Sequence, residues 1–163
     1  DSETSNNSSN SSSSKNSSSP ATSNTSATSV AGITENQKYI SISNNETTMT
    51  ADAIAKQMKS DNIPDGRLGD DGTEQDSISS IKLFRSDADY SPIGLIAVYT
   101  NEADAKDNFD NFNFPFSEHY AYQFGNVILT LNKEMNSNAQ AIELTDEFIK
   151  ITGLKLNQSY IGK

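Results

Sequence analysis

The 163-residue chain contains no cysteine and a single histidine, His119. Without cysteine it can form no disulfide and no thiolate metal site, and it has no thiol nucleophile. With one histidine, a conventional zinc site would need three or more carboxylate ligands. A Ser–His–Asp triad would have to use His119 as its base, and no Gly-x-Ser-x-Gly turn is present to hold a serine. We therefore expect a protein that is not an enzyme.

Basic residues are also scarce, with 12 Lys and Arg against 22 Asp and Glu and a formal net charge of −10. Binding to nucleic-acid phosphates requires clustered cations, so the acidity argues against a nucleic-acid partner. It argues equally against docking on anionic lipid headgroups. No apolar run approaches the roughly 20 residues that a membrane-spanning helix requires. We interpret the acidity mainly as a contribution to solubility.

The N-terminal segment has hardly any large apolar side chain before Val30, and its first 30 residues include 14 Ser, 5 Asn and 4 Thr. Such a segment cannot bury enough apolar surface to offset the roughly 1–2 kcal/mol per residue that backbone ordering costs. We predict that residues 1–36 form a disordered Ser/Asn-rich linker, about 30 Å across as a coil. Residues 37–163 are predicted to form a single domain. The start at Asp1 without Met indicates a processed or trimmed N terminus.

Three amphipathic segments predict helices. The first begins after Thr50, a good N-cap, and its apolar residues share the helical spacing: Ala51, Ile54, Ala55 and Met58. The second begins after Asn101, and its apolar side carries Ala105, Phe109 and Phe112. The third begins with a capping box of Ser137 and Gln140 and ends at Gly153. Its predicted apolar face consists of Ile142, Thr145, Phe148, Ile149 and Thr152.

Apolar, β-rich runs predict strands at residues 78–85, 93–99 and 120–131, with a weaker candidate at 38–43. Residues 93–99 are almost continuously apolar, which indicates a central strand covered on both faces. Gly125-Asn126 interrupts the last run, either as a hairpin turn or as a bulge in one long strand. The predicted fold is therefore α+β, a small mixed or antiparallel sheet of about four strands with about three helices packed on one face.

Three of these segments resemble small surface lipoproteins of Gram-positive bacteria: ADAIAKQMKSDNIPDG, IGLIAVYTNEADAKDNF and YAYQFGNVILTLN. The Ser/Asn-rich segment that starts at Asp1 is similar to the beginning of mature lipoproteins of this class. The resemblance covers about residues 50–152. It implies an extracellular protein tethered to the cell surface by a lipid-modified cysteine outside this chain. Proteins of this class mostly have no assigned activity. We expect an unidentified protein or glycan partner at the cell surface.

Four aspartates at the end of the first helix and in the loop that follows are candidate metal ligands: Asp61, Asp65, Asp70 and Asp71. Carboxylate oxygens suit Ca²⁺, and Asp61, Asp65 and Gly66 match positions 1, 5 and 6 of an EF-hand loop. Positions 3 and 12 are occupied by Ile63 and Gly72, where oxygen ligands are required. We therefore favour a flexible Asp/Gly loop without a cofactor and keep calcium-dependent adhesion as an alternative.

Aromatic side chains provide the candidate ligand-binding residues: Phe114, Phe116, Tyr120 and Tyr122. They are interpreted first as core residues and second as a platform for a partner or a sugar, since tyrosine combines an apolar ring with a polar tip. The leading hypothesis is a non-enzymatic surface module that holds a partner or ligand at the distance set by its linker. The alternative is a carboxylate-dependent glycan or cell-wall hydrolase, which requires two converging acidic side chains, one of them hard to ionise.

Overall fold

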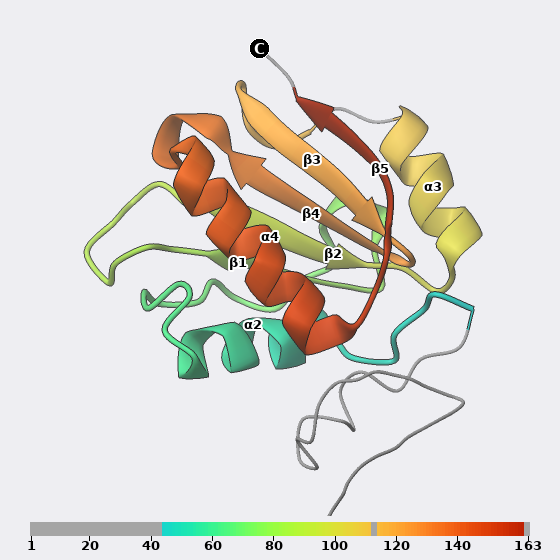
Figure 1. Cartoon of the computed structure of the whole chain (residues 1–163), viewed down its shortest axis with the longest axis horizontal. Coiled ribbons are helices and arrows are strands. Elements are labelled where there is room, and N and C mark those ends of the chain that lie inside the picture. Colours follow the sequence, from blue (N-terminus) through green and yellow to red (C-terminus); the bar gives the residue numbers. More distant parts are fainter. Residues whose placement is uncertain (1–43, 112–113, 162–163) are drawn as a thin grey trace, which may run out of the picture. The chain divides into compact units, whose positions relative to one another are not determined.

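One antiparallel sheet organises the part of the chain that the computed structural model describes, residues 44–111 and 114–161. Its strands lie in the order β1-β2-β4-β3-β5 (Figure 1). They are β1 (Ser79–Leu83), β2 (Gly94–Val98), β3 (His119–Phe124), β4 (Val127–Asn132) and β5 (Leu156–Ile161). The helices are α2 (Ala51–Ser60), α3 (Glu102–Asn111) and α4 (Asn138–Thr152), with 3-10 turns at Glu74–Asp76 and Lys133–Met135.

The predicted α+β class is confirmed by this arrangement of helices and strands. Three of the sequence predictions lie outside the described residues: the linker at residues 1–36, the strand at residues 38–43, and the place of Phe112 on the second helix.

The helix ends are formed by the capping residues that the sequence predicts. Thr50 Oγ1 accepts a hydrogen bond from the Ala53 backbone N–H (3.1 Å) at the start of α2. The Ser137–Gln140 capping box is complete at the start of α4. Gly153 ends α4 with a left-handed backbone (φ 70°), a conformation that glycine adopts without strain.

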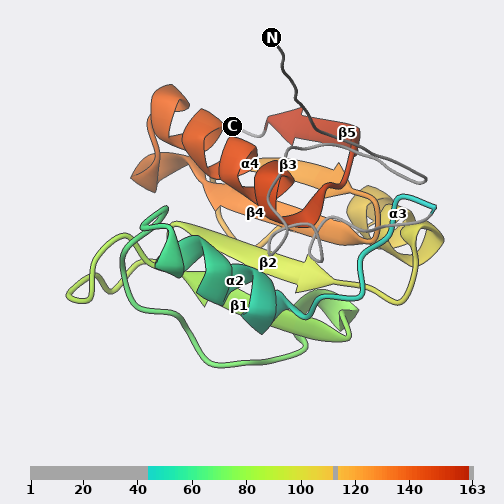
Figure 2. The same cartoon turned by 60° about the horizontal axis from the view of Figure 1, so that its bottom comes forward.

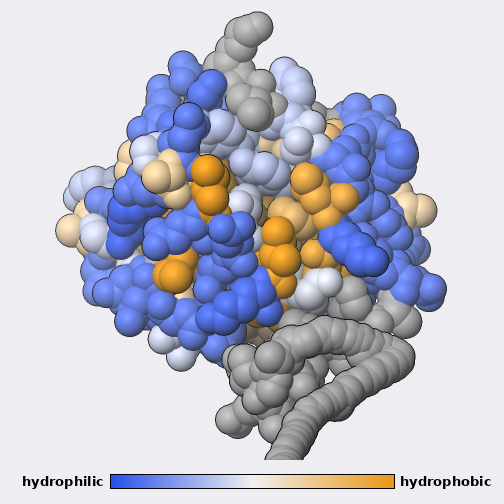
Figure 3. All heavy atoms as spheres, viewed as in Figure 1, coloured by the Kyte–Doolittle hydropathy of each residue, from blue (hydrophilic) through white to orange (hydrophobic). Residues whose placement is uncertain are grey.

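The buried side of α4 differs from the predicted one. Phe148 and Thr152 are buried as predicted, but Ile142 and Ile149 are 60% and 40% exposed. The other side chains that face the core are Ala141, Leu144, Glu147 and Ile151. Two overlapping apolar stripes run along this helix, and the prediction combined residues of both. Figure 3 shows apolar residues scattered among hydrophilic ones on this side of the molecule, and single exposed apolar residues of this kind are normal.

The helices cover both faces of the sheet rather than the single face that was predicted. α2 and α4 pack on one face, and α3 packs on the other (Figures 1 and 2). The physical reason lies in the central strands, because β2 and β4 are buried along their whole length and therefore present apolar side chains on both faces. Helices must therefore pack on both faces of the sheet to bury these side chains, and helices on a single face cannot do so.

The segment Gly125-Asn126 is a hairpin turn between β3 and β4, which settles the two alternatives left by the sequence. Gly125 has a φ of 59°, and a Cβ placed there would lie 1.9 Å from the Asn45 carbonyl oxygen. Asn126 is buried and ties the turn to its surroundings: its Oδ1 accepts from the Thr47 N–H, and its Nδ2 donates to the Thr47 and Tyr99 carbonyls. The turn is thus specified by both residues.

The strand β5 was not predicted, and it raises the strand count to five. It pairs antiparallel with β3 and forms one edge of the sheet. From Leu156 to Tyr160 its residues are polar or exposed, so its sequence lacks the apolar run that identifies the central strands. The opposite edge, β1, is covered by the loop after α2, where the Gly69 N–H donates to the Lys82 carbonyl (2.9 Å) and the Ser80 N–H to the Gly72 carbonyl (2.7 Å).

None of the helices in residues 44–111 and 114–161 is long and apolar enough to cross a membrane.

Candidate functional site

A surface hollow of about 440 Å³ lies between the start of α3 and the edge strand β5. We call it the α3–β5 hollow, and its lining residues are Glu46, Asn101, Glu102, Ala103, Lys106, Gln123 and Asn157. Apart from Ala103, every one of these side chains carries a hydrogen-bonding group. Hydrogen-bonding groups are therefore available around the hollow.

Two glutamates define the end of the hollow at the N-terminus of α3. Glu46 Oε2 accepts a hydrogen bond from the Glu102 backbone N–H (2.7 Å), and Asn101 Oδ1 accepts from the Asp104 N–H (2.8 Å). Both bonds satisfy amide groups that have no partner within the helix, and the negative charge is favoured there by the helix dipole. The Glu102 carboxylate in turn accepts from the Asn157 side-chain amide, which links α3 to β5.

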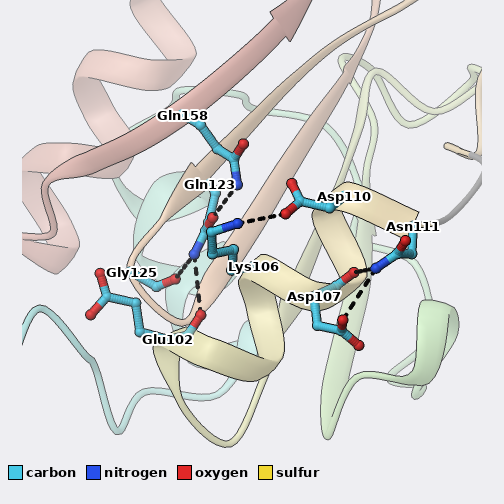
Figure 4. Close-up of polar contacts among 8 residues, drawn as sticks. All are labelled: Glu102, Lys106, Asp107, Asp110, Asn111, Gln123, Gly125 and Gln158. Atoms are coloured by element: carbon cyan, nitrogen blue, oxygen red, sulfur yellow. Dashed lines mark hydrogen bonds and ion pairs between the residues drawn. The ribbon is translucent and has the colours of Figure 1, made fainter.

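Gln123 forms the floor of the hollow and is fully buried in β3. Its Nε2 donates to the carbonyl oxygens of Glu102 (3.2 Å) and Gly125 (3.0 Å), and its Oε1 accepts from Gln158 Nε2 (2.7 Å) (Figure 4). Both ends of the buried amide are therefore paired, as a buried polar group requires. The network fixes the relative positions of α3, β3 and β5 around the hollow.

Lys106, which lines the hollow, forms an ion pair with Asp110 one turn further along α3 (Figure 4). The distance between Lys106 Nζ and Asp110 Oδ2 is 2.7 Å. The hydrogen bond to Asp110 raises the pKa of Lys106, and the bond to Lys106 lowers the pKa of Asp110. Their side chains are 66% and 37% exposed. An exposed ion pair contributes little to the free energy of unfolding. Lys106 can therefore leave Asp110 and bind a ligand with little loss of stability.

An aromatic cluster continues the same surface beyond the hollow. Phe114 contacts Phe109 (5.5 Å between ring centroids), His119 (4.7 Å) and Tyr160 (6.2 Å, stacked). Tyr160 is 51% exposed. It follows Gln158 by two residues in β5, so both side chains lie on the α3 side of the sheet, about 7 Å apart along the strand. A half-exposed ring therefore lies on the α3 side of β5, two residues beyond Gln158, whose side chain bonds to Gln123 in the hollow.

His119 is part of this aromatic cluster rather than a free surface histidine. Its Nδ1 lies 3.0 Å from the Phe116 carbonyl oxygen, so Nδ1 carries the proton that it donates. Its Nε2 is buried and has no hydrogen-bond partner among the described residues. The ring packs against Phe114 and Tyr160, and no carboxylate of the described residues contacts it in the hydrogen-bond pattern of a catalytic triad.

The four predicted ligand-binding residues lie on two different sides of the sheet. Phe114 packs with the α3 cluster, and Phe116 is half-buried beside it. Tyr120 is 7% exposed and lies in the α2–α4 core, where its hydroxyl donates to Asn138 Oδ1 (2.9 Å). Tyr122 packs against the same core and stacks with Phe124. The structure therefore does not bring the four together as one platform.

The sequence analysis missed Gln123, which lines the hollow, and two residues of β5 on the same side of the sheet, Gln158 and Tyr160. Gln123 did leave a trace in the sequence, since it is the one strongly polar residue in the apolar run from Tyr120 to Phe124. A polar residue inside a strand that is otherwise buried indicates a specific partner. Gln158 and Tyr160 left none, because the strand that carries them was itself not recognised.

The four candidate calcium ligands are also not gathered into a site. Asp65, Asp70 and Asp71 lie in the loop after α2, whereas Asp61 lies at the end of α2 next to Glu147 and Lys150. Within the described residues, no group of three or more Asp, Glu, His or Cys side chains could hold a metal ion. The proposal of calcium binding remains a prediction for solution experiments.

Asp61 and Glu147 form a second constellation, on the α2–α4 side of the sheet. Burial and, after it, contact with the Asp61 carboxyl raise the pKa of Glu147 to about 7. The pKa of Asp61 is lowered, chiefly by its hydrogen bond with Glu147. Glu147 is only 5% exposed, so its carboxyl group is closed to large molecules, whereas the Asp61 side chain is 27% exposed.

Comparison with known proteins yields no match: no family model, no curated protein sequence and no solved structure matches this chain. The geometry of the α3–β5 hollow and of the Asp61–Glu147 pair is therefore the basis for a functional proposal.

Proposed function

We propose that this chain is a non-enzymatic binding module at the cell surface and that it binds a neutral glycan in the α3–β5 hollow. The observation that carries the proposal is the half-exposed ring of Tyr160 beside a hollow lined with amides and carboxylates. The ring and Gln158 share one side of β5, so a single ligand can contact both.

Sugar chemistry fits this combination of groups. Each hydroxyl of a sugar both donates and accepts hydrogen bonds, and the hollow offers acceptors in the carboxylates of Glu46 and Glu102 and a donor in the ammonium group of Lys106. The apolar face of a sugar ring packs well on a tyrosine ring, whose hydroxyl remains available to water. A net charge of −10 disfavours phosphorylated and other anionic ligands, which is why we propose a neutral glycan.

The proposed location rests on the N-terminal segment and on the resemblance to Gram-positive surface lipoproteins. A Ser/Asn-rich segment of this composition is suited to act as a spacer between an anchor and a domain. Cell fractionation of a producing strain tests this part of the proposal. Recovery in the membrane or wall fraction, lost when a cysteine preceding Asp1 is replaced, would support tethering, and recovery in the cytosol would overturn it.

The glycan proposal is tested by NMR titration of the chain with neutral cell-wall oligosaccharides. We expect shifts of the Gln158 and Asn157 side-chain amides and of the Tyr160 ring, and at least a tenfold weaker Kd in Y160A, which corresponds to about 1.4 kcal/mol. Y90A is the matched control, because Tyr90 is 96% exposed and lies in the β1–β2 loop. Equal affinity of Y160A and Y90A, or the absence of shifts at the hollow, would refute the proposed site.

A carboxylate-dependent hydrolase is the second candidate, and the Asp61–Glu147 pair is the observation that favours it. Two acidic side chains converge there, and one of them is hard to ionise. Against this candidate, the pair lies between two packed helices and a substrate would have to separate them to reach Glu147. Release of soluble sugars from cell walls that is abolished in both D61N and E147Q would favour the hydrolase over the binding module.

A further inference from the structure

Glu147 occupies an unusual position for a glutamate. It lies on the side of α4 that faces the core, between Leu144 and Ile151, and its side chain is only 4% exposed. The end of α2 packs against this point of α4 and places Asp61 next to it. A carboxyl group in such a position needs a specific partner, because burial without one is costly.

The partners of the two Glu147 oxygens are unequal. Oε1 lies 3.7 Å from the Lys150 ammonium nitrogen, a long ion pair whose lysine side chain is 58% exposed. Oε2 is buried and has no hydrogen-bond donor among the described residues. The neighbouring Asp61 is itself a carboxyl group and accepts from Gln57 Nε2 (3.4 Å). Two ionised carboxylates can only accept hydrogen bonds, so their contact is favourable only when a proton lies between them.

We propose that Glu147 is protonated at mildly acidic pH and donates a hydrogen bond to the Asp61 carboxylate, so that this carboxyl–carboxylate bond closes α2 against α4 and opens as the pH rises through neutral. The bond gives the orphaned Oε2 a partner and leaves Asp61 ionised, where Lys150 and Gln57 stabilise it. Among the described residues, Asp61 from the end of α2 and Lys150 from α4 are the charged groups that act on Glu147.

The pH dependence of stability follows from the pKa shifts of Glu147 and Asp61. The pKa of Glu147 rises from its ordinary 4.5 to about 7 in the fold, mainly through burial. Between these values the folded chain keeps a proton that the unfolded chain has lost, so the free energy of unfolding falls as the pH rises through 7. The lowered pKa of Asp61 has the opposite pH dependence. The ionised Asp61 adds to the free energy of unfolding, and this contribution is lost when the pH falls below the ordinary value of 3.8.

Opening of this bond has a structural consequence beyond the two side chains. Asp61 is the C-cap of α2 and the first residue of the loop that covers the β1 edge of the sheet. Loss of the proton places a second negative charge beside Asp61 in a buried position. The end of α2 and the loop that follows it are therefore the part of the domain that loosens first at alkaline pH.

The experiment is a pair of pH titrations on the full chain. Carboxyl ¹³C NMR of the wild type should give a midpoint near 7 for Glu147. The Tm of the wild type should fall by roughly 5–10 °C more than that of E147Q between pH 5 and pH 8, because glutamine keeps a neutral donor at this position. E143Q is the matched control, since Glu143 is an exposed residue of the same helix, and it should follow the wild type.

Two results would overturn the inference. One is a Glu147 midpoint in the ordinary glutamate range, and the other is an equal pH dependence of Tm in E147Q and E143Q. Should E147Q fail to fold, D61N provides an independent test. The side-chain amide that this substitution introduces can donate to an ionised Glu147, so the Glu147 midpoint should fall well below that of the wild type. An unchanged midpoint in D61N would show that Asp61 is not the partner.

Discussion

The two faces of the sheet use their side chains for different purposes. Among residues 44–111 and 114–161, the α2–α4 face holds a cluster of 19 buried apolar residues, whereas the cluster under α3 has six. The α3 face compensates with polar contacts: the buried Gln123 amide, the linked glutamates and the exposed Lys106–Asp110 pair. Hydrophobic burial is the dominant favourable term in folding, so stability is concentrated on the first face and accessible polar chemistry on the second.

This division carries a lesson for function. A binding site needs groups that are held in place and still reachable, and a densely packed core offers the first property without the second. The α3 face meets both needs because its buried network holds exposed side chains. The buried Asp61–Glu147 pair is the exception on the other face, and its burial makes it sensitive to pH rather than open to ligands.

Replacing one phenylalanine on each face of the sheet by alanine should give the largest difference in stability between the two faces. Phe148 is fully buried and its ring lies 4.9 Å from that of Phe124, so F148A should lower the free energy of unfolding by about 3–5 kcal/mol. Phe109 is 8% exposed in the smaller cluster, and F109A should cost clearly less. Chemical denaturation measures both, and equal losses would contradict the proposed division of stability between the faces.

An intermediate effect is expected for the amide network. Q123A leaves the Glu102 and Gly125 carbonyls without the buried donor and should cost about 1–3 kcal/mol. Q158A removes one bond from a less buried residue and serves as the comparison, with a smaller loss. Denaturant titration would detect the difference. A Q123A variant as stable as the wild type would mean that the floor of the hollow contributes nothing to the fold.

The smallest effect on stability is expected from the exposed ion pair. K106M removes the charge from Lys106 and should leave the unfolding transition unchanged, because a solvent-exposed pair is screened and flexible. If the glycan proposal is correct, the same variant should weaken binding in the hollow several-fold. The i,i+4 pair of Lys56 and Asp52 on α2 supplies the control K56M, which should change neither property. A shift of Tm in K106M alone would show that the pair has a structural role.

Local chemistry made part of this fold predictable. The starts of α2 and α4 and the glycine that ends α4 were identified from the sequence, since an N-cap or a left-handed glycine acts within one turn of its helix. The central strand β2 was recognised by its continuous apolar run. The buried face of α4 was predicted only in part, with Phe148 and Thr152 correct and Ile142 and Ile149 wrong, because two apolar stripes share that helix and only packing against the sheet selects one of them.

The candidate site was beyond the reach of sequence reasoning for a related reason. Gln123 and Gln158 are 35 residues apart, and they meet only because β5 pairs with β3. Phe114 and Tyr122 appeared to belong to one aromatic platform, yet they pack into the clusters on opposite faces of the sheet.

By itself, the sequence determined the composition of the N-terminal segment, the acidity, the absence of thiol chemistry and the positions of the helix caps, because these depend on single residues or near neighbours. The tertiary structure decided the placement of α3 on its own face, the pairing of the polar edge strand β5, the α3–β5 hollow and the contact of Asp61 with Glu147. These features join segments that are distant along the chain, and their free energy comes from burial and pairing that exist only after the sheet has formed.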